Sequence, residues 1–269
     1  MTIKEYIAQR KLQIIDEVKV LDVVDSMSSA ERYMVAMARL TQRAHKISNM
    51  SDFVALLDRP YSVETVETMA KLPHPTIQKF GLINIAVVGA SRRFLAQITR
   101  HQNEIKFMSG SLQYSDYSDM AQFCVPYEVT KWDAEHPEQH GAARRSYLSA
   151  CADAMDDYKN AVPYIGNDAA GYMAPQGMRN VLFMSVLPFE LKHIISQRSC
   201  NRNTLETQYV MLKIWEQLYD WPMFKDCGPG CMQDGCKEGK MSCEHGLAAC
   251  KSPTDILKRQ FKYLYTEET

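Results

Sequence analysis

The sequence predicts a mainly helical α+β fold. Apolar residues recur at three- and four-residue steps through most of the 269-residue chain, which is the spacing of amphipathic helices. Only a few segments are apolar, β-branched and bounded by glycine, which are the features typical of strands. Neither the G-x-G-x-x-G loop nor the G-x-x-x-x-G-K-S/T loop is present, so the usual dinucleotide and nucleoside-triphosphate folds are disfavoured.

The N-terminal part of the chain predicts three helices. Between Ile3 and Leu57 the apolar spacing indicates two of them, the second capped by Ser28 or Ser29. The third covers Val63–Leu72. It ends there because the proline that follows lacks an amide proton and disfavours helical geometry in its predecessor.

A strand, a helix and a loop come next. Residues Phe80–Gly89 are apolar and partly β-branched, which predicts a strand of about eight residues. A helix begins at Ser91. The segment Lys106–Ser118 is dense in serine, glycine and tyrosine, so it predicts a loop or an irregular strand edge.

The C-terminal half predicts further helices. Their ranges are Arg144–Val162, Gln176–Ser185, Glu190–Arg198 and Leu205–Tyr219, with a short last helix over Pro253–Tyr265. The expected division is a domain of residues 1–225, a glycine- and cysteine-rich insert of residues 226–250, and a C-terminal helical segment, 251–269.

Charge and composition limit the partners. The chain has 31 Lys and Arg residues against 32 Asp and Glu residues, so its net charge of −1 gives no bulk attraction toward nucleic acid or an anionic membrane. The N-terminus carries charges every few residues, unlike a secretory signal, and no stretch reaches the roughly 18 apolar residues of a membrane span. We expect a cytoplasmic protein without nucleic-acid or membrane partners.

One cluster of polar residues suits phosphate binding. It lies at a predicted helix end and in the loop that follows, and consists of Gln97, Arg100, His101, Gln102, Ser109, Gly110, Ser111, Gln113 and Tyr114. A guanidinium makes bidentate contacts to phosphate, and hydroxyls and backbone amides complete the oxygen shell. By residue type alone, a solvated helix end explains the same cluster.

A second cluster pairs His193 with Arg198 on an apolar helix. A buried arginine beside a planar base hydrogen-bonds a ring carbonyl and stabilises negative charge that develops on the ring. An ion pair between this arginine and a nearby carboxylate such as Glu206 accounts for the same pattern. Periodicity does not separate the two interpretations.

Six short motifs follow one another between about residue 70 and residue 215. They are His74–Thr76, Gly89–Arg92, Gln97–Gln102, Ser111–Tyr114, Ala170–Pro175 and Leu191–Arg202. In order and spacing they resemble the motifs H-x-S, G-V-S-R, Q-x-x-R-H-R, S-x-R-Y, A-R-x-x-L-P and L-x-H-F-F-x-x-R-x-C-N-R of the flavin-dependent thymidylate synthase family. One such match is uninformative, but this many in one order are not expected by chance.

The resemblance implies a fold and a reaction. The fold is mainly helical around a small antiparallel sheet, and it assembles as a homotetramer whose active sites are built from several subunits. FAD is held at the interfaces, NADPH reduces it, methylenetetrahydrofolate donates a one-carbon unit, and C5 of dUMP is methylated to give dTMP. No enzyme cysteine attacks the ring, so Cys200 is expected to pack within its helix.

Carried over position by position, the resemblance also assigns roles to residues. The catalytic positions are Arg198, which polarises the uracil, and Ser111. The cofactor positions are His74, Thr76, Arg100, His101, Gln102 and His193. The nucleotide positions are Gln97, Arg100, Ser109, Gly110, Ser111, Gln113, Tyr114 and Arg198.

Several arginines of the family pattern are missing. Gln102, Gln113, Gly171 and Phe189 stand at such positions. Each charge-assisted hydrogen bond is worth about 1.5–3 kcal/mol, so two lost phosphate contacts weaken a nucleotide by roughly two orders of magnitude without compensation. The compensating cations available are Arg179, Lys192 and Arg202. Three outcomes stay open: unaltered dUMP methylation, altered C5 chemistry such as hydroxymethylation on dUMP or another pyrimidine nucleotide, and a non-catalytic scaffold of the same fold.

The insert concentrates metal ligands. Six of them fall within 24 residues: Cys227, Cys231, Cys236, Cys243, His245 and Cys250. A structural Zn²⁺ needs four, and the first four cysteines are the predicted set. The spacing lacks a C-x2-C pair, so a zinc clip and a loop of reduced thiols both fit, and the insert resembles the tails of some family members. We assign it no catalytic role.

Overall fold

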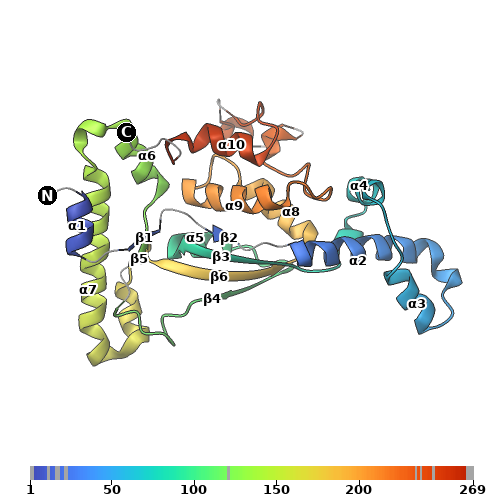
Figure 1. Cartoon of the computed structure of the whole chain (residues 1–269), viewed down its shortest axis with the longest axis horizontal. Helices are drawn as coiled ribbons and strands as arrows, with labels where there is room; N and C mark the ends of the chain where they lie inside the picture. Colours follow the sequence, from blue (N-terminus) through green and yellow to red (C-terminus); the bar gives the residue numbers. More distant parts are fainter. Residues whose placement is uncertain are drawn as a thin grey trace.

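The structure, a computed structural model, describes residues 3–10, 13–15, 19–20, 24–119, 122–233, 235–236, 238–243 and 246–264. A four-stranded antiparallel sheet lies at the centre of these residues, and helices cover it and extend beyond both of its ends (Figure 1). The predicted mainly helical α+β fold around a small antiparallel sheet is confirmed.

The main sheet has one buried and one exposed face. Its strands, in spatial order, are β2 (Lys19–Val20), β3 (Ile83–Ser91), β6 (Arg179–Val186) and β4 (Ile105–Ser109), each antiparallel to its neighbours. Along β6, Leu182, Met184 and Val186 are buried whereas Val181 and Phe183 are exposed. This alternation is the period of a strand that faces the core on one side only.

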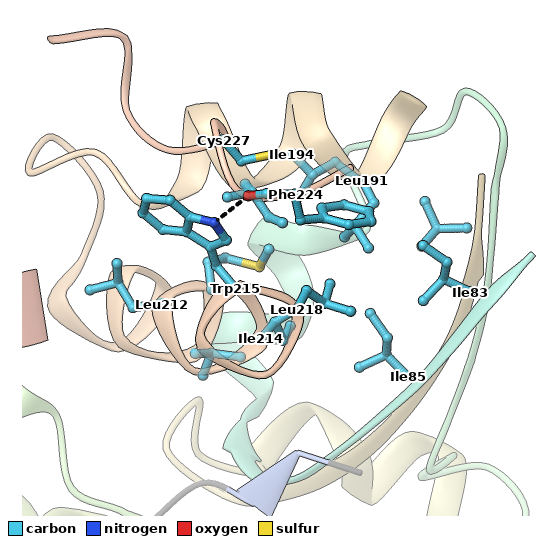
Figure 2. Close-up of a cluster of buried hydrophobic side chains, with 14 of the residues drawn as sticks. Ile83, Ile85, Leu191, Ile194, Leu212, Ile214, Trp215, Leu218, Phe224 and Cys227 are labelled. Carbon is cyan, nitrogen blue, oxygen red and sulfur yellow. Dashed lines mark hydrogen bonds between the residues drawn. The ribbon is translucent and has the colours of Figure 1, made fainter. Parts of the chain in front are cut away.

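Helices α8 (Pro188–Arg198) and α9 (Leu205–Leu218) lie over the buried face, and α10 (Pro253–Gln260) packs on α9 (Figure 1). Trp215 of α9 is fully buried on the side toward α8 and residues 224–227, and its indole Nε1 donates a hydrogen bond to the Phe224 carbonyl at 2.8 Å (Figure 2). A buried indole contributes a large apolar surface, and the bond avoids an unpaired buried donor. This packing fixes the position of α8 and of Arg198 at its end.

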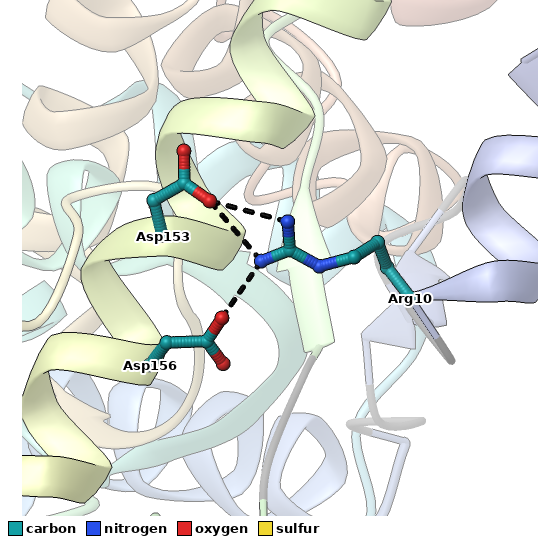
Figure 3. Close-up of polar contacts among 3 residues, drawn as sticks. All are labelled: Arg10, Asp153 and Asp156. Atoms are coloured by element: carbon teal, nitrogen blue, oxygen red, sulfur yellow. Dashed lines mark hydrogen bonds and ion pairs between the residues drawn. The ribbon is translucent and has the colours of Figure 1, made fainter.

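One end of the molecule is built around the long helix α7 (Ala142–Ala170). Helices α1 (Ile3–Gln9) and α6 (Tyr127–Glu135) pack against it. The guanidinium of Arg10, which follows α1, reaches Asp153 at 3.2 Å and Asp156 at 2.9 Å on α7 (Figure 3). Exposed ion pairs are worth about 0–1 kcal/mol each, so these orient α1 more than they stabilise the fold. A short parallel pair, β1 (Gln13–Ile15) with β5 (Gln122–Cys124), continues from this end.

The opposite end holds α2 (Val24–Arg43), α3 (Met50–Leu57) and α4 (Val63–Lys71) (Figure 1). The region predicted as two helices therefore contains α1, α2, α3 and two short strands, because β1 and β2 interrupt it. Ser28 and Ser29, predicted as caps, lie inside α2, since that helix begins at Val24. No helix within the described ranges is both long and apolar enough to cross a bilayer.

One predicted helix is wrong. The segment Gln176–Ser185 contains most of β6, which pairs with both β3 and β4. Its run of consecutive apolar residues fits a buried helix and a strand equally well by periodicity. The segment is a strand, because β6 pairs with strands on both sides: Val186 lies opposite Ile83 of β3 and opposite Ile105 of β4.

Most of the other predicted elements are confirmed. The helices over Val63–Leu72, Arg144–Val162, Glu190–Arg198 and Leu205–Tyr219 are α4, α7, α8 and α9. The predicted strand is β3, and α5 (Arg92–Ile98) follows with the Ser91 hydroxyl accepting from the Phe94 amide. The predicted Lys106–Ser118 loop begins as β4, and the last predicted helix is α10, whose expected end at Tyr265 lies outside the described residues.

Glu31 is a buried carboxyl group on α2. Its side chain is 6% exposed, and its Oε1 has no hydrogen-bond partner within the described residues. Burial raises the pKa of Glu31 to about 7, because a low-dielectric environment disfavours the charged form. The folded protein thus holds this proton more tightly than the unfolded chain, and stability is lost as the pH rises from the unfolded pKa through about 7.

We expect Glu31→Gln to stabilise the protein in a pH-dependent way. Ionising Glu31 costs up to about 3 kcal/mol above pH 7, so the variant gains about 1–3 kcal/mol over the wild type near pH 8.5 and much less near pH 5. Urea unfolding at the two pH values measures this. Glu138→Gln, at an exposed carboxylate, is the control. A gain for Glu31→Gln that is equal at both pH values would contradict the assignment.

Candidate active site

Arg198 ends α8, and its guanidinium is held on three sides. Its Nε donates to His101 Nε2 at 2.8 Å, Nη1 to Asn203 Oδ1 at 3.2 Å and Nη2 to the Gln97 carbonyl at 3.5 Å. A guanidinium has five N–H donors, so one remains on each terminal nitrogen. Together they form a fork that matches a carbonyl or carboxylate acceptor.

His101 is a buried histidine that is neutral at neutral pH. Burial, with the charges of Arg198, His193 and Arg100, lowers the pKa of His101 to about 4. Its Nε2 can therefore accept the Arg198 bond, while the remaining proton sits on Nδ1 and faces Glu190 Oε1 at 3.8 Å. Burial raises the pKa of the Glu190 carboxyl. A protonated imidazole has no lone pair for the Arg198 bond, so this bond requires the neutral ring.

Glu206 has a structural role separate from Arg198. Its buried carboxylate accepts the Ser91 amide at 2.7 Å and the Ser91 hydroxyl at 2.6 Å, and Cys124 Sγ lies 3.3 Å from it. Negative charge is favourable there because α5 begins at the next residue and the N-terminal end of a helix dipole is positive. No carboxylate of the described residues forms an ion pair with Arg198, so the alternative of an Arg198–Glu206 pair is not realised.

A cavity of about 600 Å³ opens beside Arg198. Asn203 and His193 line it together with Ser196 and Gln197. A neighbouring cavity of about 500 Å³ shares His193 and Ser196 and is lined on its far side by Pro75 and Phe189. His193 therefore stands between the two, within reach of a ligand in either.

The other predicted cofactor residues are exposed around this region. His74 and Thr76 lie at the turn Pro75–Lys79, which borders the smaller cavity. Arg100 and Gln102 lie at the C-terminal end of α5, on either side of the buried His101. Gln97 is engaged internally, since its Oε1 accepts from the Thr207 hydroxyl at 2.7 Å.

The predicted nucleotide loop lines a separate cavity of about 610 Å³. Ser109, Gly110, Ser111 and Gln113 all border it, with Ser111 Oγ accepting from the Gln113 amide at 3.1 Å. Arg92 of α5 lies in the same cavity and has no side-chain hydrogen bond or ion pair within the described residues. Tyr114 is 84% exposed, away from these contacts.

The first predicted cluster is divided within one chain. Gln97 and His101 lie against Arg198 of the second cluster, whereas residues 109–113 line a different cavity. The cavity of Arg198 and the cavity of Ser111 share no lining residue. Sequence reasoning missed three residues: Glu190, Asn203 and Arg92. Glu190 could have been found as an acidic residue on an apolar helix, three positions before His193. Arg92 is the last residue of the motif Gly89–Arg92, which the family resemblance did not assign to the nucleotide.

Two of the three cations proposed as compensation for the missing arginines are hydrogen-bonded elsewhere, and the third, Arg179, lines a different cavity. Lys192 Nζ donates to Gln78 Oε1 at 3.1 Å, and Arg202 Nη1 donates to the Met241 carbonyl at 2.8 Å. Arg179 lines a cavity that also contains Asp116 and Asp119. Arg92 is the cation that the described residues place at the nucleotide loop.

Residues 22–222 match a family model described as thymidylate synthase complementing protein. The chain belongs to this family. The flavin-dependent thymidylate synthase of Geobacter sulfurreducens is 25% identical over 231 residues, which is 81% of this chain and 88% of the relative. The flavin-dependent thymidylate synthase of Thermococcus onnurineus is 25% identical over 178 residues, 62% of this chain and 69% of the relative.

Solved structures share the fold. A UMP/dUMP methylase PolB from Streptomyces cacaoi, bound with 5-Br UMP, matches with a TM-score of 0.60 at 15% identity, over 80% of this chain and 95% of that one. A flavin-dependent thymidylate synthase from Helicobacter pylori, complexed with FAD and dUMP, matches with a TM-score of 0.53 at 16% identity, over 79% and 99%. With the family match, the predicted resemblance is confirmed: the chain is a divergent thymidylate synthase-like enzyme.

We expect Glu206→Ala to lower the free energy of unfolding by about 3 kcal/mol, because it leaves the buried Ser91 amide and hydroxyl without their acceptor. Glu135→Ala on α6 is the comparison, since it removes an exposed ion pair with Lys131 worth at most about 1 kcal/mol. Urea unfolding of both variants measures the difference. Equal losses would show that the Ser91 contacts contribute nothing special.

Proposed function

We propose that this protein is an FAD-dependent enzyme that methylates C5 of dUMP to give dTMP, with methylenetetrahydrofolate as one-carbon donor and NADPH as reductant. The observation that carries the proposal is Arg198, whose guanidinium is fixed by neutral partners and keeps two N–H donors for a ligand in the adjoining cavity. The relatives named flavin-dependent thymidylate synthase support the same reaction.

The residues around His193 fit a flavin dinucleotide. Arg100 is an exposed cation without a side-chain partner among the described residues, which suits the negative charge of a diphosphate. His74, Thr76 and Gln102 offer further exposed donors around it, and His193 reaches both cavities. When bound and reduced by NADPH, the flavin would supply the hydride that completes the methyl group.

Arg198 would act on the uracil ring. Its two remaining N–H groups donate to a ring carbonyl and stabilise the negative charge that develops as C5 becomes nucleophilic. Because His101 is neutral and Asn203 is uncharged, the positive charge of Arg198 is not cancelled by its own supports. The three bonds hold the fork before the substrate arrives, so little reorganisation is needed during the reaction.

Arg92 would hold the phosphate of the nucleotide. It stands where the Ser109 and Ser111 hydroxyls border the same cavity, and it supplies the charge that Gln113 lacks. Guanidinium with hydroxyl donors is a common phosphate-binding combination.

We propose a cytoplasmic homotetramer whose active sites lie between subunits. The separation of Arg198 and Arg92 into two cavities supports this arrangement. The exposed face of the sheet supports it too. Val88 pairs with Val181, and Met108 with Phe183, so four exposed apolar residues are neighbours on that face. Contiguous apolar surface of this kind is typical of an interface.

A second candidate is altered C5 chemistry, for example hydroxymethylation, or a ribonucleotide substrate. Two observations favour this candidate. Gln113 and Phe189 stand where the family pattern has arginine, and a protein of the same fold is named a UMP/dUMP methylase.

The deciding experiment is the visible spectrum of the protein with FAD, followed by NADPH oxidation with dUMP, UMP or dCMP. Turnover with dUMP and dTMP as product supports the first proposal. Flavin binding with turnover of another nucleotide replaces it, and no flavin binding removes both.

We expect Arg198→Lys to lower kcat by about 100-fold or more with a smaller change in the KM for dUMP, because one lost electrostatic contact in a transition state costs about 10²–10³. A lysine keeps the charge but cannot make the three fixed bonds. Arg259→Lys, an exposed position on α10, is the control. Retention of kcat in Arg198→Lys would remove Arg198 from the reaction.

We expect Arg92→Gln to weaken dUMP binding by about 10- to 100-fold, which corresponds to about 1.5–3 kcal/mol for a charge-assisted contact. Binding of deoxyuridine, which has no phosphate, should not change. Arg93→Gln, exposed on the same helix, is the matched control. Isothermal titration with both ligands measures this, and equal weakening of dUMP and deoxyuridine would contradict a phosphate role.

A further inference from the structure

Four cysteines from two distant parts of the chain line the cavity beside Arg198. Cys231, Cys236 and Cys243 belong to the insert, and Cys200 follows α8 two residues after Arg198. Cys236 is exposed and the other three are partly exposed, so all four thiols can meet a ligand from solvent. Spacing in the sequence groups the insert cysteines together, but only the fold adds Cys200 to them.

Cys227, the first cysteine of the predicted zinc set, has a different environment. It is 5% exposed and packs in the core near Ile194 and Phe224 (Figure 2). Cys227 lines the smaller cavity and not the one that the other four cysteines share. The next residue, Gly228, has φ +118°, and a Cβ there would lie 2.6 Å from the Trp215 ring, so the backbone is pressed against the core.

The four thiols line one cavity beside the end of α8. Within the insert, a Cβ on Gly246 would lie 3.9 Å from Cys231 Sγ and 3.7 Å from the Cys243 carbonyl. The chain therefore folds back so that the loop cysteines approach the end of α8.

A further contact ties the insert to this place. Arg202, two residues after Cys200, donates to the Met241 carbonyl at 2.8 Å, two residues before Cys243. The contact holds Cys243 beside the turn that follows α8. Arg198 and Arg202 both line the same cavity, where their positive charges would offset the negative charges of several thiolates.

We propose that Cys200, Cys231, Cys236 and Cys243 bind one zinc ion, which joins the insert to the turn that follows Arg198 at the end of α8. Four thiolates in a tetrahedral arrangement are a standard structural zinc site, and soft thiolates favour zinc over magnesium or calcium. Within the described residues no three His, Cys, Asp or Glu side chains are close enough together to hold a metal ion, so zinc binding must draw the loop thiols toward Cys200. Binding converts four thiols to thiolates and releases their four protons to solvent, with no change of oxidation state.

The zinc site borders the cavity in which Arg198 is proposed to meet the nucleotide, so its test reads metal binding and does not use activity. The full chain is loaded with zinc, dialysed against a weak chelator and assayed for metal by mass spectrometry. We expect one zinc per chain in the wild type. In Cys200→Ser and in Cys243→Ser the zinc affinity should be more than about 100-fold weaker, since loss of a residue that only hydrogen-bonds to a metal ligand already lowers affinity about 10- to 100-fold. Cys227→Ala and Cys151→Ala, at two buried cysteines elsewhere, should keep the metal.

Cobalt substitution gives a second readout. A four-thiolate site produces intense sulfur-to-metal charge-transfer absorption, which should decrease and shift in Cys200→Ser even where some metal remains bound. Circular dichroism confirms that each variant is folded, and the exposed Cys236→Ser is used if a buried change disturbs the fold. Zinc retained unchanged by Cys200→Ser, zinc lost by Cys227→Ala, or a disulfide between two of the four thiols would overturn the proposal.

Discussion

The site depends on one hydrogen bond, from Arg198 Nε to His101 Nε2. Only a neutral imidazole accepts it, and the ring is neutral because α8 and the residues around it exclude water. Trp215 packs against α8, whose last residue is Arg198, and so supports the helix that carries one partner of this bond. The burial of His101 itself gives the most important cation of the site an uncharged partner.

The fold was largely predictable because its helices carry local signals. Stop signals such as Pro73 and caps such as Ser91 act through neighbouring residues, so the sequence alone locates α4 and α5. The failure at β6 has the opposite cause. Its identity as a strand is decided by partners about 80 and 100 residues earlier in the chain, β4 and β3, and no local rule contains that information.

The residue types of the candidate site follow from the sequence, whereas its contacts do not. Motif order assigns roles to Arg198, His101 and the nucleotide loop, which stay predictions, and it does not reveal that Arg92 stands beside that loop. The insert shows the same limit. The spacing in the sequence shows how many cysteines lie close together along the chain. The fold decides which of them line a common cavity, so the proposed set contains Cys200 in place of Cys227.

The separation of Arg198 and Arg92 has a genetic consequence. If neighbouring subunits complete each other's sites, as we propose, each chain contributes one half to each of two different centres. A chain damaged at one half still supplies an intact opposite half to its neighbour. Two inactive alleles, one changed at Arg198 and one at Arg92, would then restore a fraction of whole centres when their products assemble together, whereas two alleles changed at the same half would not.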